Sequence, residues 1–372
     1  MNAKETVREI LALAGINLNG EQPWDMQVHD ERFYQRALSY GSLGVGESYM
    51  DGWWDARQLD EFFSRVQKAE LQGTLKTLAV SWLVARGRLF NRQSRHGSKR
   101  VAREHYDLGN DLYQAMLDKN MQYTCAYWKD AKSLDQAQEN KLHLICKKLY
   151  LKPRMKVLEL GGGFGGLARF MAREYGCEVV SYNLSHEQVT FGRQFCEGLQ
   201  VRLEEKDYRE ALHESGGFDR VAAIGLCEHI GPKNYRSFLD LVHAKLKDGG
   251  LFLLHTIGGN NSLTATDPWI DKYIFPNGVI PSMVQLGAAM EGTWVVEDWH
   301  NFGPDYDKTL VAWWKNFDIR YCTLDKSRYD QRFYRMWKMY LMMSAGAFRA
   351  RRLQLWQFVM SKGHLGSYVP VR

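Results

Sequence analysis

The chain has 372 residues, of which 45% are hydrophobic, so it is long enough for one large domain and a smaller one with a substantial core. Its apolar runs, such as 251–254 and 341–343, fall far short of the about eighteen residues that a membrane-spanning helix needs. The net charge of +6 is modest, and the six cysteines have neither the spacing of a zinc ribbon nor that of a disulfide framework. These features exclude a membrane-spanning protein and a disulfide scaffold, and they predict a cytoplasmic protein with free thiols.

The first part of the chain, residues 1–85, combines helical periodicity with polar turns and predicts a small helical domain. Charged residues interrupt its first apolar patch, so this end reads as an amphipathic helix and not as a signal peptide. Further helices are expected at 32–38, 59–66 and 75–84, and the segment 40–54, rich in glycine and aromatic residues, separates the first two.

A basic segment, 86–102, follows the small helical domain and marks the best domain boundary, because apolar periodicity disappears there. Its basic residues, together with Arg103, form a run without any acidic residue. Such a run can bind anionic lipid or nucleic acid, or it can be a solvated linker. The residues alone leave this choice open.

Strands and helices alternate in the remainder, 103–372, which predicts a doubly wound, mostly parallel α/β sheet. A helix at 234–246 is expected to end at the C-cap Asp248-Gly249-Gly250. Two late segments, 294–299 and 353–360, are expected to close the sheet as an antiparallel pair, with a helical region around 334–348 between them. The expected parallel strands are 157–160, 179–183, 201–204, 221–225 and 251–256, which makes seven strands in all.

The most informative motif is the glycine-rich turn that follows the strand 157–160, in which Gly161, Gly163 and Gly165 have a G-x-G-x-G spacing. Such a turn lets a ligand approach the backbone and the N-terminus of the next helix, although it can also be purely structural. Glu159 precedes the turn, and Asn183 ends the second strand, where a dinucleotide site would have an acidic residue nearby. This pattern favours S-adenosylmethionine over NAD.

Polar residues follow each predicted strand, and the carboxyl ends of parallel strands form the ligand-binding edge of an open sheet. Leu184 and Gln188 follow the second strand, and Gln188 either binds a ribose or is a solvated helical residue. After the third strand come Asp207 and Tyr208. Asp207 either accepts a hydrogen bond from an adenine amino group or caps a helix.

Two further residues at this edge are candidates for a general base. Glu228 follows the fourth strand, where a carboxylate is costly unless it is paired or functional. His255 interrupts the apolar fifth strand and is either a ligand of the site or a satisfied core histidine. Because these residues lack the spacing of metal ligands, no metal is expected.

With these motifs in view, the chain resembles the bacterial cyclopropane-fatty-acyl-phospholipid synthases and the related mycolic acid cyclopropane synthases over nearly its full length. The resemblance implies methyl transfer from S-adenosylmethionine to a cis double bond of a phospholipid acyl chain, and then ring closure of a carbocation as bound bicarbonate removes a proton. The strings that carry it are 46–54, 104–111, 121–128, 228–235, 254–258, 273–278 and 297–303.

The resemblance also assigns residue roles. Glu228 and His255 become holders of the bicarbonate instead of bases. The implied bicarbonate ligands are Cys125, Glu228, His255, the backbone of Ile257, and Tyr306, all of which are present. The implied cofactor contacts are Tyr123, Thr124, the glycine turn, the segment 183–188, Asp207 and Tyr208.

In proteins that this chain resembles, the small domain assists dimerisation and contact with the bilayer. We therefore expect a homodimer that associates peripherally with the inner face of the membrane, with the basic segment used for lipid and not for nucleic acid. A sister enzyme forming methyl-branched or methylene fatty acids, a methyltransferase for a soluble small molecule, and a lipid-binding paralogue without activity are the alternatives. Departures from the family pattern are Glu159 for Asp, Gly162 for Cys, Phe164 for Trp and Asn183 for Thr.

Overall fold

A computed structural model describes the chain except for residues 1, 72–108 and 364–365. The helix predicted at 75–84, the basic segment 86–102 and the first part of the string 104–111 lie outside the described residues. Two compact units are present. One contains the described part of Met1–Phe90 together with Thr264–Asn277 and Tyr306–Leu353, and the other contains the described part of Asn91–Leu263 together with Gly278–Asp305 and Gln354–Arg372.

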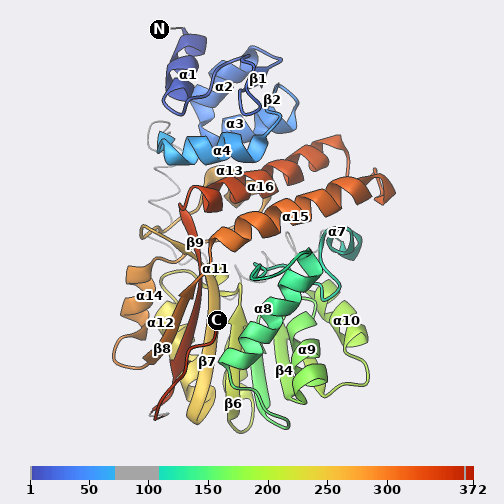
Figure 1. The fold of residues 1–372 in the computed structure, drawn as a ribbon, viewed down its shortest axis with the longest axis vertical. Helices are drawn as coiled ribbons and strands as arrows, with labels where there is room; N and C mark the ends of the chain where they lie inside the picture. Colours follow the sequence, from blue (N-terminus) through green and yellow to red (C-terminus); the bar gives the residue numbers. More distant parts are fainter. Residues whose placement is uncertain (1, 72–108, 364–365) are drawn as a thin grey trace. The chain divides into compact units, whose positions relative to one another are not determined.

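The second unit is built on a seven-stranded sheet with the strand order β5-β4-β3-β6-β7-β9-β8 (Figure 1). Five neighbouring strands of this sheet are parallel, which confirms the predicted doubly wound, mostly parallel architecture. The strands are β3 (Lys156–Leu160), β4 (Glu178–Asn183), β5 (Val201–Glu205), β6 (Phe218–Ile224), β7 (Leu246–Gly259), β8 (Val295–Asn301) and β9 (Leu353–Ser361).

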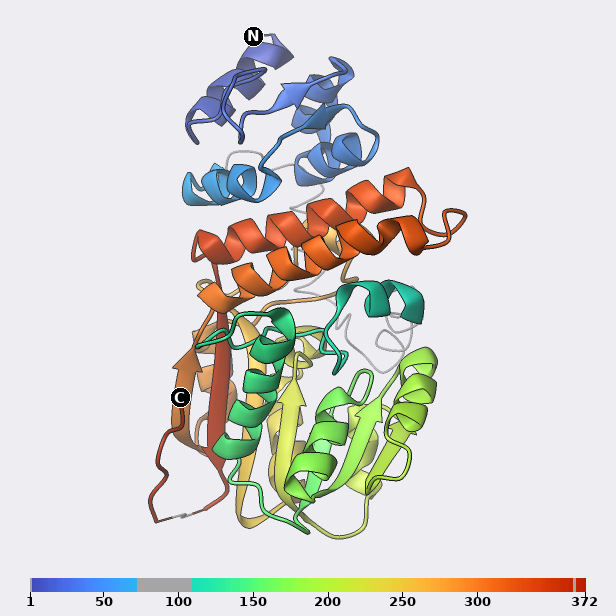
Figure 2. The ribbon, with the colours of Figure 1, turned by 45° about the vertical axis from the view of Figure 1, so that its right-hand side comes forward.

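Helices cover both faces of this sheet, and Figure 2 shows α8 and α9 in front of the strands. Consecutive residues of β3 belong to opposite cores: Val157 packs with α8 and α9, and Leu158 packs with α12 and α14. A strand that is buried on both faces needs apolar residues on both, which explains Val157, Leu158 and Leu160 of β3, while the buried Glu159 is the exception. The helical elements of this unit are α7 (Asn110–Met116), α8 (Leu134–Lys148), α9 (Gly166–Tyr175), α10 (His186–Phe195), η3 (Tyr208–His213), α11 (Cys227–Ile230), α12 (Tyr235–Lys245) and α14 (Met283–Met290).

The last two strands close the sheet as predicted, because β8 and β9 pair antiparallel. Gly249 donates a hydrogen bond to Lys362 O (3.0 Å), and Gly258, near the other end of β7, lies against Trp356, so β9 also runs opposite to β7. The predicted C-cap at Asp248–Gly250 is wrong. α12 ends at Lys245 and β7 begins at Leu246, so the two glycines lie within the strand and pair with Lys362.

The first unit is mainly helical and confirms the helices predicted near 32–38, 59–66 and 334–348. It differs from the expectation in the segment 40–54, which contains an additional helix, α3. The elements of this unit are α1 (Ala3–Ala12), β1 (Gln27–Val28), α2 (Arg32–Tyr40), α3 (Ser42–Met50), β2 (Trp54–Asp55), α4 (Leu59–Lys68), α13 (Pro268–Tyr273), α15 (Pro304–Arg320), η4 (Tyr321–Thr323) and α16 (Gln331–Arg349).

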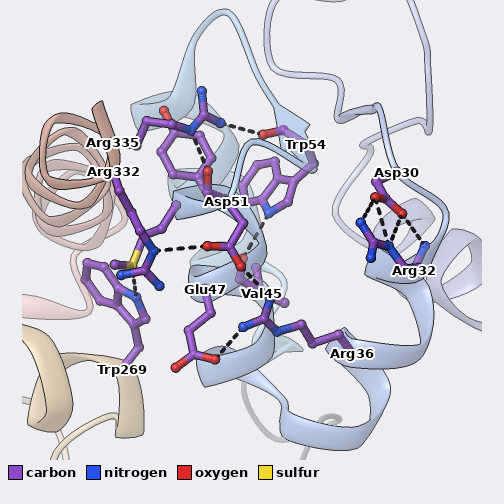
Figure 3. A network of polar contacts seen from close by, with 12 residues as sticks. Asp30, Arg32, Arg36, Val45, Glu47, Asp51, Trp54, Trp269, Arg332 and Arg335 are labelled. Carbon is purple, nitrogen blue, oxygen red and sulfur yellow. Dashed lines mark hydrogen bonds and ion pairs between the residues drawn. The ribbon is translucent and has the colours of Figure 1, made fainter. Parts of the chain in front are cut away.

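Late segments of the chain complete this first unit, as the polar network in Figure 3 shows. Arg332 and Arg335 of α16 donate to Asp51 and to the Trp54 carbonyl, at 3.0 and 2.9 Å. Gly46 lies against the Trp269 indole, where a Cβ atom would overlap the ring. The compact unit that holds the N-terminal helices therefore includes 264–277 and 306–353, although both segments belong to the range 103–372 that was predicted to form the α/β part.

None of the helices in the described part of the chain combines the length and the hydrophobicity needed to cross a bilayer.

Candidate active site

The glycine turn between β3 and α9 adopts a conformation that requires glycine. Gly161, Gly163 and Gly165 have φ angles of 84°, 53° and 78°, in the left-handed region. The amides of Gly161 and Gly162 donate to Tyr182 O at 2.9 and 3.0 Å, which ties the turn to the end of β4. A Cβ atom on Gly163 would meet no atom within 4 Å. The turn therefore presents an open backbone surface where a ligand can lie directly before the N-terminus of α9.

Glu159 lies beneath this turn and supports it. Its Oε2 accepts a hydrogen bond from Ser181 Oγ at 2.6 Å, and its side chain is buried. Burial raises the pKa of Glu159 to about 7, against the opposing effects of Ser181 and Lys141. A side chain at Gly162 would overlap the Ser181 hydroxyl, so Gly162, Ser181 and Glu159 form one interdependent group.

The predicted segment after β4 lies against the glycine turn. Asn183 Nδ2 donates to Gly163 O (3.2 Å) and to Gln188 Oε1 (2.8 Å), and Leu184 N donates to Asn183 Oδ1 (3.0 Å). Gln188 is buried, so the alternative of a solvated helical glutamine is wrong. The structure thus brings Gly163, Asn183, Leu184 and Gln188 together.

Asp207 follows β5 and caps the short helix η3. Its Oδ1 accepts from the Arg209 amide at 2.9 Å, and the Arg209 guanidinium donates to both carboxylate oxygens at 3.0 and 2.8 Å. The helix-cap alternative therefore holds for this buried residue, and its contact with adenine stays a prediction. Tyr208 packs edge-on against Phe238, with ring centroids 5.4 Å apart.

The segment with Tyr123, Thr124 and Cys125 lies at the carboxyl end of β6. A Cβ atom on Gly225, which directly follows β6, would be 2.9 Å from Thr124 Cγ2. Thr124 is held through its carbonyl by Gln138 Nε2 (2.8 Å) and through its hydroxyl by Lys141 Nζ (3.0 Å). Cys125 is fully buried, and its thiol contacts Ala126 O at 3.2 Å.

Glu228 and Ile257 meet where β6 and β7 end. The Ile257 amide donates to Glu228 Oε1 at 2.7 Å, while Glu228 Oε2 is buried and has no hydrogen-bond partner among the described residues. Burial raises the pKa of Glu228 to about 7, although the Ile257 amide opposes this shift. The Ile257 amide is therefore already occupied by Glu228. The Ile257 carbonyl accepts one hydrogen bond, from Thr256 Oγ1 (3.0 Å), and keeps a second lone pair that could accept another.

His255 is fully buried in β7 and is not a fully satisfied core histidine. Gln357 Nε2 lies 3.2 Å from its Nδ1, while Nε2 has no hydrogen-bond partner among the described residues. Burial, and then the positive charges of Lys141 and Lys148, keep the pKa of His255 well below 6.5. A neutral ring whose Nδ1 accepts from Gln357 carries its proton on Nε2, so His255 offers one unused donor.

Tyr306 belongs to the other compact unit, so its role as a partner of Cys125, Glu228 and His255 stays a prediction. Within its unit it lies in the first turn of α15, and its ring packs in a tilted arrangement against Phe348, with ring centroids 4.6 Å apart.

Sequence reasoning missed Lys141, the fully buried residue that contacts Thr124. A signal for it exists: Leu134, Ala137, Lys141, Ile145 and Lys148 recur every three to four residues on α8. Lysines that continue an apolar stripe are expected to be buried with it.

The sequence profile of the family "Mycolic acid cyclopropane synthetase" matches residues 93–358. The chain is 50% identical over 356 residues to the cyclopropane-fatty-acyl-phospholipid synthase of Escherichia coli strain K12, which covers 95% of this chain and 92% of that protein. It is 36% identical over 271 residues to a probable fatty acid methyltransferase of Pseudomonas putida, covering 69% of this chain and 68% of that protein.

Among solved structures, the fold resembles the mycolic acid cyclopropane synthase CmaA1 complexed with SAH and CTAB, with a TM-score of 0.63 and 27% identity. That match covers 71% of this chain and 98% of the other. The cyclopropane synthase MmaA2 from Mycobacterium tuberculosis gives a TM-score of 0.63 and 25% identity over the same shares of the two chains.

Proposed function

Because the chain belongs to the mycolic acid cyclopropane synthetase family, whose profile matches most of its length, we propose that it is a cyclopropane-fatty-acyl-phospholipid synthase that uses S-adenosylmethionine. The observation that carries this proposal is the 50% identity with the Escherichia coli synthase across 95% of the chain. In the proposed reaction, the cis double bond of an unsaturated phospholipid acyl chain takes a methyl group from the sulfonium. Loss of one proton from that methyl then closes the cyclopropane ring.

The residues around the glycine turn fit S-adenosylmethionine. Gly163 presents an open face, and the fixed Asn183–Gln188 pair and the Asp207 cap border the same carboxyl edge of the sheet. A related structure of this fold contains SAH. Tyr123, Thr124, Gly161, Gly163, Gly165, Asn183, Leu184, Gln188, Asp207 and Tyr208 would hold the cofactor.

The unused polar atoms near β6 and β7 fit a small anion that carries one proton, such as bicarbonate. His255 Nε2 is a buried donor without a hydrogen-bond partner among the described residues, and Glu228 Oε2 is a buried oxygen that also has no partner among them. A buried polar group without a hydrogen bond is costly to the fold, so a ligand that forms hydrogen bonds with both groups is favoured. When bound, S-adenosylmethionine supplies the methyl group and bicarbonate accepts the proton.

The protein's own residues would then position and desolvate these groups. The neutral His255 would donate from Nε2, and Gln357 would hold the ring in that orientation. Glu228, held by the Ile257 amide, would accept or donate one hydrogen bond through Oε2, according to its protonation. A dry pocket matters because the alkene is a weak nucleophile, so that positioning and exclusion of water must supply much of the rate enhancement.

We further propose that the protein works as a homodimer docked peripherally on the inner face of a bilayer. The docking on the bilayer is supported by the composition of the basic segment 86–102, which suits anionic lipid. Flotation with vesicles of anionic phospholipid at low and high salt tests docking, and sedimentation velocity tests the dimer. Equal amounts of floated protein with neutral and anionic vesicles, or a monomer at micromolar concentration, would contradict these two proposals respectively.

The deciding experiment supplies methyl-labelled S-adenosylmethionine and vesicles that contain cis-monounsaturated chains. Labelled cyclopropane fatty acids are the expected product by mass spectrometry. The Pseudomonas putida relative is described as a probable fatty acid methyltransferase, so methyl-branched or methylene products would reassign the chain to that sister activity. Label transfer only to soluble acceptors, or no transfer at all, would refute the proposal.

A further inference from the structure

Two buried lysines on the same face of α8 differ in how their charges are compensated. Lys148 Nζ forms an ion pair with Asp298 at 3.0 Å. Lys141, seven residues earlier and equally buried, donates among the described residues to the uncharged oxygens Gln122 Oε1 and Thr124 Oγ1. No carboxylate among the described residues lies within ion-pair distance of Lys141, so its charge lacks a direct partner there.

A buried ammonium without a counter-charge is costly to the fold. Burial lowers the pKa of Lys141 to about 8, while the more distant Asp118, Cys125 and Glu159 oppose this shift. Lys141 is therefore still mostly protonated at neutral pH. Such a group needs an anion close by or a role that offsets its cost.

The proposed bicarbonate site would hold a negative charge but lacks a positive charge among its direct ligands. Its ligands Cys125, Glu228 and the neutral His255 contribute no positive charge, and an ionised Glu228 would repel an anion. Lys141 contacts Thr124, the neighbour of Cys125, and its charge acts on both Cys125 and His255. The uncompensated cation and the anion site therefore lie within electrostatic range of one another.

We propose that Lys141 is a positioning residue that supplies the counter-charge of the bicarbonate site and fixes the segment carrying Thr124 and Cys125. This inference rests on the proposed function and adds to it a residue that is distinct from the anion's direct ligands. It explains why a lysine occupies a dry position opposite neutral oxygens.

The test is direct binding of carbon-13-labelled bicarbonate, followed by its NMR line width, to the full chain in the presence of S-adenosylhomocysteine. Lys141→Met should weaken bicarbonate binding about tenfold or more, the size expected of one unit charge acting through a protein interior. Lys141→Gln, which keeps a donor without the charge, should weaken it similarly and serves if the Met variant does not fold. Affinity for S-adenosylhomocysteine, measured by calorimetry, should change less than threefold in the Gln variant.

Lys148→Met is the matched control, because it removes an equally buried lysine from the same helix whose charge is already paired. It should lower the unfolding temperature and, because Asp298 compensates the Lys148 charge, weaken bicarbonate binding much less than Lys141→Gln does, although the Lys148 charge also acts on His255. Unchanged bicarbonate affinity in Lys141→Gln, an equal loss in Lys148→Met, or no bicarbonate binding to the wild-type protein would each overturn the inference. Failure of the proposed function is separate: it would appear as absence of cyclopropane product from a wild-type protein that binds bicarbonate in a Lys141-dependent way.

Discussion

Glu228→Gln is expected to abolish most turnover and yet to stabilise the protein above neutral pH. Gln keeps an oxygen that can accept from the Ile257 amide, so the local contact at 2.7 Å can persist. The substitution removes a buried carboxyl group whose pKa is raised to about 7 by burial. The charge that folding must bury at high pH is then absent.

The sign and size of this effect follow from proton linkage. The folded pKa lies above the unfolded value, so the folded state binds more protons and the stability contributed by Glu228 is complete only below about pH 4.5. It is lost as the pH rises through about 7. A displacement from 4.5 to about 7 corresponds to about 3 kcal/mol, since each pH unit is worth about 1.4 kcal/mol. The Gln variant should avoid this loss.

Urea unfolding of the wild type and of Glu228→Gln at pH 5 and pH 8 measures the effect. The difference in unfolding free energy should favour the variant by about 1 to 3 kcal/mol more at pH 8 than at pH 5. In parallel, cyclopropane formation should fall at least about a hundredfold while affinity for S-adenosylhomocysteine stays within threefold. An identical pH dependence of stability in both proteins would refute the burial argument, and equal losses of turnover and cofactor affinity would place Glu228 in the cofactor site.

Three further substitutions and one control substitution test the support of the site and of the first unit. Gly225 has a left-handed φ of 67°, and a Cβ atom there would lie 2.9 Å from Thr124 Cγ2. Gly225→Ala should therefore lower the unfolding free energy by about 1 to 2 kcal/mol and weaken S-adenosylhomocysteine binding in calorimetry. Gly198→Ala, with a φ of 77° and open space, should reproduce the strain without the binding loss. Ser181→Ala leaves Glu159 Oε2 without its donor and should lower the unfolding free energy by about 1 to 3 kcal/mol in urea titrations, more at pH 8 than at pH 6. Gly46→Ala should destabilise the first unit by about 1 to 3 kcal/mol through overlap with Trp269, visible as an earlier tryptophan fluorescence transition; unchanged transitions would show that the indole can shift freely.

The sheet and its ligand edge were predictable because their signals are local. The mostly apolar strand β3 followed by a glycine-rich turn, and the alternation of strand and helix patterns, are signals carried by neighbouring residues. The position of Asp207, Glu228 and His255 after or near strand ends then follows from parallel pairing alone. The predicted C-cap at Gly249-Gly250 failed because the same glycines serve a strand whose partner, Lys362, is more than a hundred residues away.

Features that depend on tertiary contacts were not predictable from the sequence. Lys141 continues the apolar stripe of α8, but only the packing of that helix shows that its ammonium group is buried and contacts Thr124. The sequence allows Asp207 either an adenine contact or a helix cap, and the hydrogen bond from the Arg209 amide shows only that it caps η3. The composition of the first unit depends on contacts such as Arg335 with Trp54, which join segments far apart in the chain.

The discontinuous first unit has a consequence for synthesis on the ribosome. α16 packs against α4: Gly346 lies against the α4 backbone near Ser64, and Arg349 pairs with Asp60 at 2.6 Å. α4 leaves the ribosome early, whereas α16 is translated near the end. The face of α4 around Phe63 therefore lacks its α16 partner while more than 250 residues are translated. The nascent N-terminal helices should be long-lived chaperone clients, and a chain that stalls before α16 should be a preferred target for proteolysis.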